Sequence, residues 1–243
     1  MKNFLKKLTG IIFPNQCLAC AKIIDDDGLF CNEDWQKLKF ITTPKCAICS
    51  QPFAFDMGLE EKLICPACLE NRPSFDDSII IFHYNEPLKK AIGDLKYRDN
   101  INLSKKFAQL LVNKLKNEAQ NYDLIIAVPL HKKRLQHRKF NQSILLARFI
   151  SKAFKHLKFH PDILLRTKNT KSQVSLSQKD RMQNLRNIFE INAKYKNEIL
   201  GKKILLIDDV MTTGATLDNC SQALKKAGAK HVTAVTIAKN ILS

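Results

Sequence analysis

The chain lacks any long, uninterrupted run of apolar residues. Its start, residues 1–14, places three lysines among apolar side chains, so the run is too broken and too short for a signal peptide or a membrane span. This segment is instead predicted to pack as an amphipathic helix. We therefore expect a cytoplasmic protein without a membrane span.

Acidic residues are scarce in residues 131–186. That segment holds fifteen Lys/Arg and only Asp162 and Asp180, so it carries +13 by itself in a chain of net charge +17. Residues 1–75 are balanced, with nine basic and nine acidic side chains. A one-sided excess of this size favours a polyanionic partner, either nucleic acid or a pyrophosphorylated substrate. A solvated basic surface is the alternative.

A Walker-type phosphate loop is also absent, because no G-K-[ST] sequence follows the apolar run at residues 204–207. This run reads as a buried central strand. Two acids, Asp208 and Asp209, follow it directly, and a Thr/Gly-rich turn leads into a helix predicted at residues 217–227. In open α/β sheets, ligands bind outside the carboxyl ends of the strands, so this turn is the first candidate site.

The turn offers two kinds of ligand group. Its entry into a helix presents backbone N–H groups and the positive end of the helix dipole to an anion, and Thr212, Thr213 and Thr216 add hydroxyl donors. Asp208 and Asp209 are poor phosphate ligands but good acceptors for sugar hydroxyls. A phosphate cradle beside a diol clamp suits a ribose 5-phosphate. The alternative is a strand that ends in solvated acids before an ordinary capped helix.

Seven of the eight cysteines precede residue 70, and six of them form three C-x-x-C pairs. In a chain without a secretion signal, this spacing is typical of metal binding rather than of disulfides. Sequential pairing predicts a complete four-thiolate zinc site at Cys46, Cys49, Cys65 and Cys68.

A second, incomplete set precedes it and comprises Cys17, Cys20, Cys31 and Asp34. Here a carboxylate stands where a fourth cysteine is expected. Three thiolates with one carboxylate is an unusual structural zinc site. The alternatives are an interleaved pairing, or a lost metal with the hairpins held by packing of Phe30, Trp35 and Leu38. One or two structural zinc ions are therefore expected.

Strand and helix patterns alternate after a boundary near residues 72–75. Strands are predicted at residues 78–84, 124–128, 164–166, 188–191, 204–207 and 232–237. Helices are predicted at residues 88–95, 103–115, 179–187 and 217–227, with a further helix that opens in the basic run at 131–142 and ends near 154. This alternation predicts an α/β fold with a mostly parallel sheet flanked by helices. The predicted domains are a double zinc ribbon, residues 1–75, and an α/β domain, residues 76–243.

The apolar run, the two acids and the T-T-G-x-T turn resemble the signature of the type I phosphoribosyltransferases. With the C-x-x-C pairs and the R-x-F-N-Q segment at residues 138–142, the chain resembles the ComF/GntX family over essentially its whole length. That family has a double zinc ribbon before a phosphoribosyltransferase-like fold and is associated with DNA uptake in natural transformation. Two departures are visible: Asp34 replaces the usual cysteine, and Lys139 stands where the family usually has glycine.

The resemblance implies a pocket for phosphoribosyl pyrophosphate with Mg²⁺, or for a related nucleotide. Its residues would be Asp208, Asp209, Met211, Thr212, Thr213, Gly214, Ala215, Thr216, Pro129, Lys132 and Arg134. The resemblance also implies single-stranded DNA as a partner, held by cations around the mouth of the same pocket. Those cations would be Lys132, Lys133, Arg134, Arg138, Lys139, Lys168 and Lys171.

Three functions of different classes follow. The first is a protein that handles single-stranded DNA, with DNA-uptake or recombination proteins as partners. The second is a salvage-type phosphoribosyltransferase in which Asp208 and Asp209 are the catalytic residues. The third is a zinc-ribbon adaptor with a vestigial fold, and intact Asp208, Asp209 and Gly214 argue against it. The ribbon and the basic segment favour the first over the second.

Overall fold

The computed structural model describes residues 15–24, 28–54, 63–97, 101–131, 135–136, 139–167 and 188–241. Their helices and strands are α2 (Asn32–Gln36), α3 (Pro66–Glu70), β1 (Asp77–His83), α4 (Glu86–Tyr97), α5 (Ile101–Leu115), η1 (Ala119–Asn121), β2 (Leu124–Ala127), α7 (Gln142–Ala153), β3 (Lys158–Phe159), β4 (Leu164–Arg166), β5 (Phe189–Ile191), η2 (Ala193–Tyr195), α9 (Lys196–Ile199), β6 (Lys203–Ile207), β7 (Val210–Met211), α10 (Ala215–Lys226) and β8 (His231–Lys239). Within this part of the chain, no helix combines the length and apolar character that a membrane span needs.

The strands β1, β8, β6, β2 and β3 form a parallel sheet in that order, and β7 extends it by pairing with the end of β8. The predicted parallel sheet is confirmed, and β6 lies near its middle, between β8 and β2. β4 and β5 pair antiparallel in a separate two-stranded sheet. Because parallel strands end at the same edge, the residues after β6 and β2 meet there.

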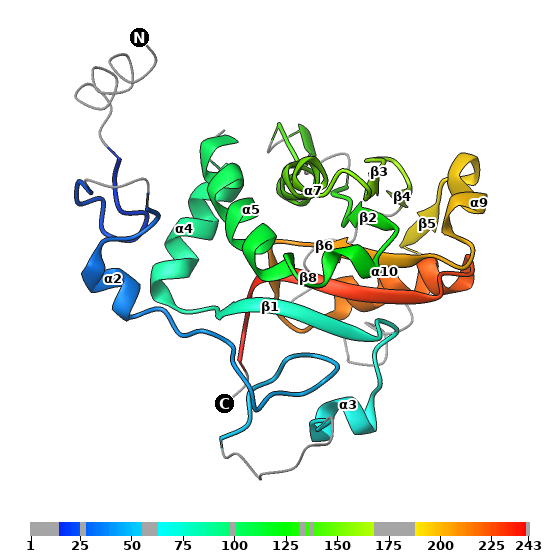
Figure 1. Cartoon of the computed structure of the whole chain (residues 1–243), viewed down its shortest axis with the longest axis horizontal. Helices are drawn as coiled ribbons and strands as arrows, with labels where there is room; N and C mark the ends of the chain where they lie inside the picture. Colours follow the sequence, from blue (N-terminus) through cyan, green and yellow to red (C-terminus); the bar gives the residue numbers. More distant parts are fainter. Residues whose placement is uncertain are drawn as a thin grey trace.

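Side chains of β6 and β2 alternate between two hydrophobic clusters, one on each face of the sheet. Leu205 and Ile207 join the cluster that includes α4, α5 and α7, whereas Ile204 and Leu206 join the cluster that includes α10. Figure 1 shows α4, α5 and α7 together above the sheet. Since both faces are covered, the strands carry continuous apolar runs instead of an alternation with polar residues.

The cysteine-rich segment packs on both faces of this sheet. Cys17, Phe30 and Leu38 belong to the cluster with α4 and α5, while Cys46 and Cys65 belong to the cluster with α10. Figure 1 accordingly shows α2 beside α4, and α3 below the sheet.

Residues 39–41, between these two parts, run along the free edge of β1. The Ile41 N–H donates to the Ile81 carbonyl at 2.8 Å, and the His83 N–H donates to the Lys39 carbonyl at 2.8 Å. The ribbon is therefore anchored to the sheet by backbone hydrogen bonds as well as by apolar contacts. The division at residue 75 stays a prediction.

The predicted elements are confirmed to within a few residues, except that the helix expected from the basic run begins later. α7 starts at Gln142 because the Asn141 side chain caps it, accepting from Ser143 N at 2.9 Å and Ile144 N at 3.4 Å. Several predictions lie outside the described residues: the helix at 1–14, the helix at 179–187, and the side chains of Lys132, Lys133, Arg134, Arg138, Lys168 and Lys171.

Asn141 generates a stability prediction, because its buried amide also donates from Nδ2 to the Val128 carbonyl at 3.0 Å. Asn141→Ala removes the cap and the donor to a buried carbonyl, so we expect the free energy of unfolding to fall by about 2–4 kcal/mol. Urea unfolding followed by circular dichroism measures it. The control is Asn192→Ala, which removes a cap that accepts from Lys194 N at 3.2 Å. In this control the free energy of unfolding should fall by less than about 1 kcal/mol. Equal losses in the two variants would contradict this role.

Candidate functional site

Asp208 and Asp209 lie directly after β6, and hydrogen bonds orient both carboxylates. Asp208 Oδ1 accepts from Ser143 Oγ at 2.9 Å and from the Asp209 N–H at 2.9 Å. Asp209 is 9% exposed, and its Oδ1 accepts from the Val210 N–H at 2.7 Å. Neutral donors, a hydroxyl and two backbone amides, therefore help to orient both carboxylates.

The turn after the acids leads from β7 into α10 through Gly214. This residue has φ +80°, in the left-handed region that favours glycine, and it is the N-cap of α10. Thr212, Thr213 and Thr216 are exposed, and Thr213 Oγ1 accepts from the Ala215 N–H at 3.4 Å. The first amides of a helix have no partner within it, so the predicted anion cradle has the required backbone form.

The neighbouring strand β2 brings Pro129 to the same edge. The Val128 N–H donates to the Ile207 carbonyl at 2.9 Å, directly before the two acids. Ser143, from the start of α7, reaches Asp208 at this edge. Pro129, Asp208 and Asp209 therefore lie at one edge of the sheet, and Ser143 is a neighbour of Asp208 that the sequence did not predict. An Asn before an apolar-periodic segment is an N-cap signal, and it would have placed Ser143 at the helix start.

Lys139 has φ +62°, the left-handed region in which a side chain is strained. The glycine that the resemblance implies at this position would adopt this backbone conformation without strain. Lys139 is exposed and Phe140 is half-buried, just before the Asn141 cap. The chain keeps the turn and adds a cation to the loop between Pro129 and α7.

The four thiols of Cys46, Cys49, Cys65 and Cys68 gather with their Sγ atoms within 4.8 Å of one another. We call this set the second thiol cluster, because another set precedes it in the chain. Cys49 Sγ and Cys65 Sγ are 3.6 Å apart, too far for a disulfide but close to the edge of about 3.8 Å in a tetrahedral zinc–thiolate site. Hydrogen bonding between the two thiols lowers the pKa of Cys46 and raises the pKa of Cys49. The donor set fits zinc.

Cys17, Cys20, Cys31 and Asp34 form a first thiol cluster, also within 4.8 Å. Asp34 Oδ2 accepts from Cys17 Sγ at 3.2 Å and from Cys31 Sγ at 3.4 Å. The carboxylate oxygen therefore takes the fourth ligand position beside the three thiols. Hydrogen bonds from Lys37 Nζ, and then from the thiols, hold the pKa of Asp34 well below its usual range. Of the alternatives left open by the sequence, the structure has the sequential pairing, and the set fits zinc with a mixed ligand shell.

Together, these features define a class: a double zinc ribbon joined to a phosphoribosyltransferase domain. The chain matches the family description "Double zinc ribbon domain" over residues 8–69 and "Phosphoribosyl transferase domain" over residues 141–241. It is 36% identical to competence protein F of Haemophilus influenzae over 173 residues, which cover 69% of this chain and 75% of the relative.

Two further relatives cover more of the chain. The DNA utilization protein YhgH of Escherichia coli is 29% identical over 201 residues, 77% of this chain and 86% of the relative. Competence protein ComFC of Bacillus subtilis is 27% identical over 226 residues, 90% of this chain and 87% of the relative. The chain belongs to the ComF family of competence proteins.

The two thiol clusters generate a prediction about metal content. Because a carboxylate replaces one thiolate, the first cluster should hold zinc more weakly, and protein purified without chelator should retain about one tightly bound zinc per chain and a second at partial occupancy. Asp34→Cys should raise the tightly bound content toward about two. Elemental analysis after mild chelation measures this. A protein without zinc, or an unchanged count in Asp34→Cys, would contradict it.

Proposed function

We propose that the edge after β6 binds phosphoribosyl pyrophosphate or ribose 5-phosphate, and that the protein uses this site while handling single-stranded DNA. The observation that carries the proposal is the arrangement of two oriented carboxylates, Asp208 and Asp209, beside the left-handed Gly214 turn that opens α10. One turn thus offers acceptors for two sugar hydroxyls and donors for a phosphate.

Each part of the ligand has a place in this proposal. Asp208 and Asp209 accept from the ribose 2- and 3-hydroxyls. The amides and hydroxyls of Thr212, Thr213, Gly214, Ala215 and Thr216, with Met211 at the start of the turn, hold the 5-phosphate. The segment after Pro129, with Lys132 and Arg134, faces the pyrophosphate, where bound Mg²⁺ supplies charge neutralisation. If pyrophosphate leaves the anomeric carbon, positioning and carboxylate charge near the cationic centre would provide the catalysis.

The names of the relatives support the DNA part of the proposal, since they refer to competence and to DNA utilization. The excess of +13 in residues 131–186 supplies cations that can track phosphates. The proposed contacts are Lys132, Lys133, Arg134, Arg138, Lys139, Lys168 and Lys171. Proteins of DNA uptake or recombination would be its partners in the cytoplasm.

A salvage-type phosphoribosyltransferase is the second candidate. The match to a phosphoribosyl transferase domain and the oriented acids favour it. In that case Asp208 and Asp209 are catalytic residues and a base or amine is the acceptor. Release of pyrophosphate on addition of a base, measured with phosphoribosyl pyrophosphate present, separates it from the first candidate.

Asp208→Asn combined with Asp209→Asn tests the diol clamp. Each amide keeps an oxygen that can accept from the Ser143 hydroxyl or the Val210 N–H, so the apo melting temperature should stay within ~4 °C of the wild type. Saturating phosphoribosyl pyrophosphate should raise the melting temperature of the wild type by about 5 °C or more and leave the variant unmoved. Differential scanning fluorimetry measures both.

The matched control removes two exposed carboxylates elsewhere, with Asp162→Asn and Glu190→Gln. It lowers the negative charge by the same amount and should respond to the ligand like the wild type. Undiminished ligand-induced stabilisation in the Asp208/Asp209 variant would refute the clamp.

Single-stranded DNA binding should weaken steeply with salt, with log K falling by about 0.7 per neutralised phosphate as log salt rises. Reversing Lys132, Lys133, Arg134 and Lys139 to Glu should remove most of the affinity at moderate salt. The measurement is fluorescence anisotropy of a labelled oligonucleotide at several salt concentrations. The cysteine-rich segment is balanced in charge, so it should add little through electrostatics.

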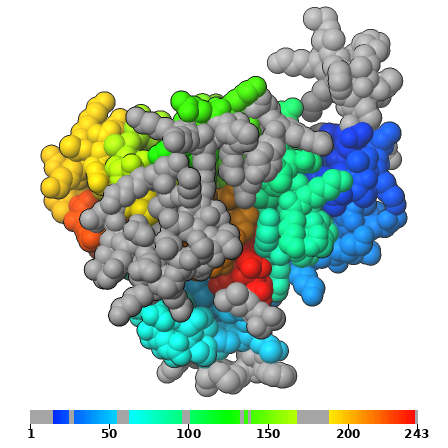
Figure 2. Space-filling model, turned by 180° about the vertical axis from the view of Figure 1, so that it is seen from behind, coloured from blue at the N-terminus to red at the C-terminus, as the bar shows by residue number. Residues whose placement is uncertain are grey.

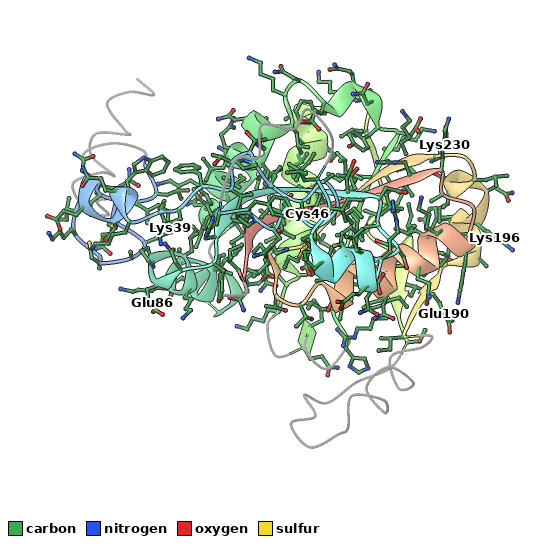
Figure 3. The ribbon with its side chains drawn as sticks, turned by 90° about the horizontal axis from the view of Figure 1, so that it is seen from below. Lys39, Cys46, Glu86, Glu190, Lys196 and Lys230 are labelled. Atoms are coloured by element: carbon green, nitrogen blue, oxygen red, sulfur yellow. The ribbon has the colours of Figure 1, made fainter. Side chains whose placement is uncertain are left out.

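The control replaces four exposed lysines with Glu: Lys194, Lys196, Lys226 and Lys230. They precede strands β6 and β8 or lie in α10, away from the carboxyl edge of the sheet. Figure 3 shows Lys196 and Lys230 at one end of the molecule, away from Cys46. Both variants change the net charge equally, so loss of binding in the first alone assigns the cations. Equal loss in both, or none in the first, would refute the assignment.

A further inference from the structure

A cavity of about 650 Å³ lies between the second thiol cluster and the turn at the start of α10. The ribbon contributes Cys49, Gln51 and Cys65, the first three residues of α3, and the segment from Asn71 to Phe75. The turn from Met211 to Ala215 also lines it, together with Asp218, Lys239 at the end of β8, and Asn240. The residues proposed to hold a phosphate therefore also line a space that the ribbon shares.

Hydrogen bonds fix these walls relative to one another. The Ser74 N–H donates to Asp218 Oδ1 at 2.6 Å, which joins the ribbon to α10. Lys239 Nζ donates to the Cys49 carbonyl at 2.8 Å, and the Asn240 N–H donates to the Met211 carbonyl at 2.9 Å. Figure 1 shows α3 below the sheet, Figure 3 shows it beside α10, and Figure 2 shows the end of β8 on the same face as α3. The cavity is thus built into the fold.

The lining combines apolar surface with a few polar groups. Phe75 and Met211 are 3% and 2% exposed, and Pro66, Ala67 and Pro73 add apolar surface. Lys239 is buried, and its ammonium group has three donors, of which the Cys49 carbonyl takes one and the Cys49 sulfur another. The side-chain amides of Gln51, Asn71 and Asn240 also belong to the lining. A volume of this size, mostly apolar with convergent polar groups, is typical of a small-molecule site.

We propose that this cavity receives the nucleobase of a ribonucleoside 5′-monophosphate whose phosphate lies on the Thr212–Thr216 turn and whose ribose hydroxyls meet Asp208 and Asp209. This proposal rests on the proposed function of the same turn. A flat heteroaromatic ring fits between the apolar walls, and its carbonyl and ring nitrogen acceptors match Lys239 and the amides. The zinc ribbon thereby supplies one wall of the ligand site rather than forming a separate module.

Isothermal titration calorimetry with ribose 5-phosphate, GMP and UMP, on the full zinc-loaded chain, tests the proposal. At least one nucleotide should bind tenfold or more tightly than ribose 5-phosphate, because only the nucleotide fills the cavity. Ala67→Phe projects a ring into the cavity from α3, and it should abolish this tenfold gain while leaving the affinity for ribose 5-phosphate within twofold. Ala67→Leu is a smaller filling change for use if the first variant loses zinc.

Leu69→Phe is the matched control, because Leu69 lies on the same helix, is 68% exposed and does not line the cavity. It should bind all three ligands like the wild type. If the nucleotides gain nothing over ribose 5-phosphate, or if the filled variants keep the gain, the cavity assignment is wrong while the proposed function stands. If ribose 5-phosphate and phosphoribosyl pyrophosphate do not bind either, both proposals fall.

Discussion

The position of β6 between β8 and β2, covered on both faces, is the constraint on which the candidate site depends. Buried acids need hydrogen-bond partners, so β6 ends where Asp208 and Asp209 begin, and β7 then pairs with the end of β8 beyond them. The parallel register then brings Val128 and Pro129 beside them, and α7 adds Ser143. The chemistry of the edge thus follows from the burial of the strand behind it.

The ribbon is a structural part of the same core. Cys46, Cys65 and Phe75 share a cluster with Leu206 and Met211, so zinc held by these thiols would stabilise the core that also packs the sheet. Lys239, at the end of β8, adds a hydrogen bond between the sheet and the ribbon, because its buried ammonium donates to the Cys49 carbonyl. The ammonium also lies beside thiols that bound zinc would keep as thiolates. In this chain, the zinc ribbon and the phosphoribosyltransferase domain therefore share one hydrophobic cluster.

Lys139 shows how a local backbone demand and a surface charge meet at one position. The turn before α7 needs a positive φ, and a lysine adopts it at a cost of about 1–2 kcal/mol per residue. The Asn141 cap and its bond to the Val128 carbonyl stabilise the same turn. The extra cation therefore lies on a loop whose shape the neighbouring residues determine.

The sequence by itself determined the order and type of the elements, because periodicity and turn residues act over short distances. It also predicted the acids with their turn, and the complete second thiol cluster, but it left the pairing in the first cluster open. Tertiary structure alone decided that Asp34 reaches the fourth corner of the first cluster, and that Ser143 meets Asp208 from 65 residues away. It also decided that Lys239 reaches Cys49 across 190 residues, and that the ribbon lines a cavity with the phosphate turn. These contacts depend on which faces of the sheet the separate segments cover, and no local pattern encodes that choice.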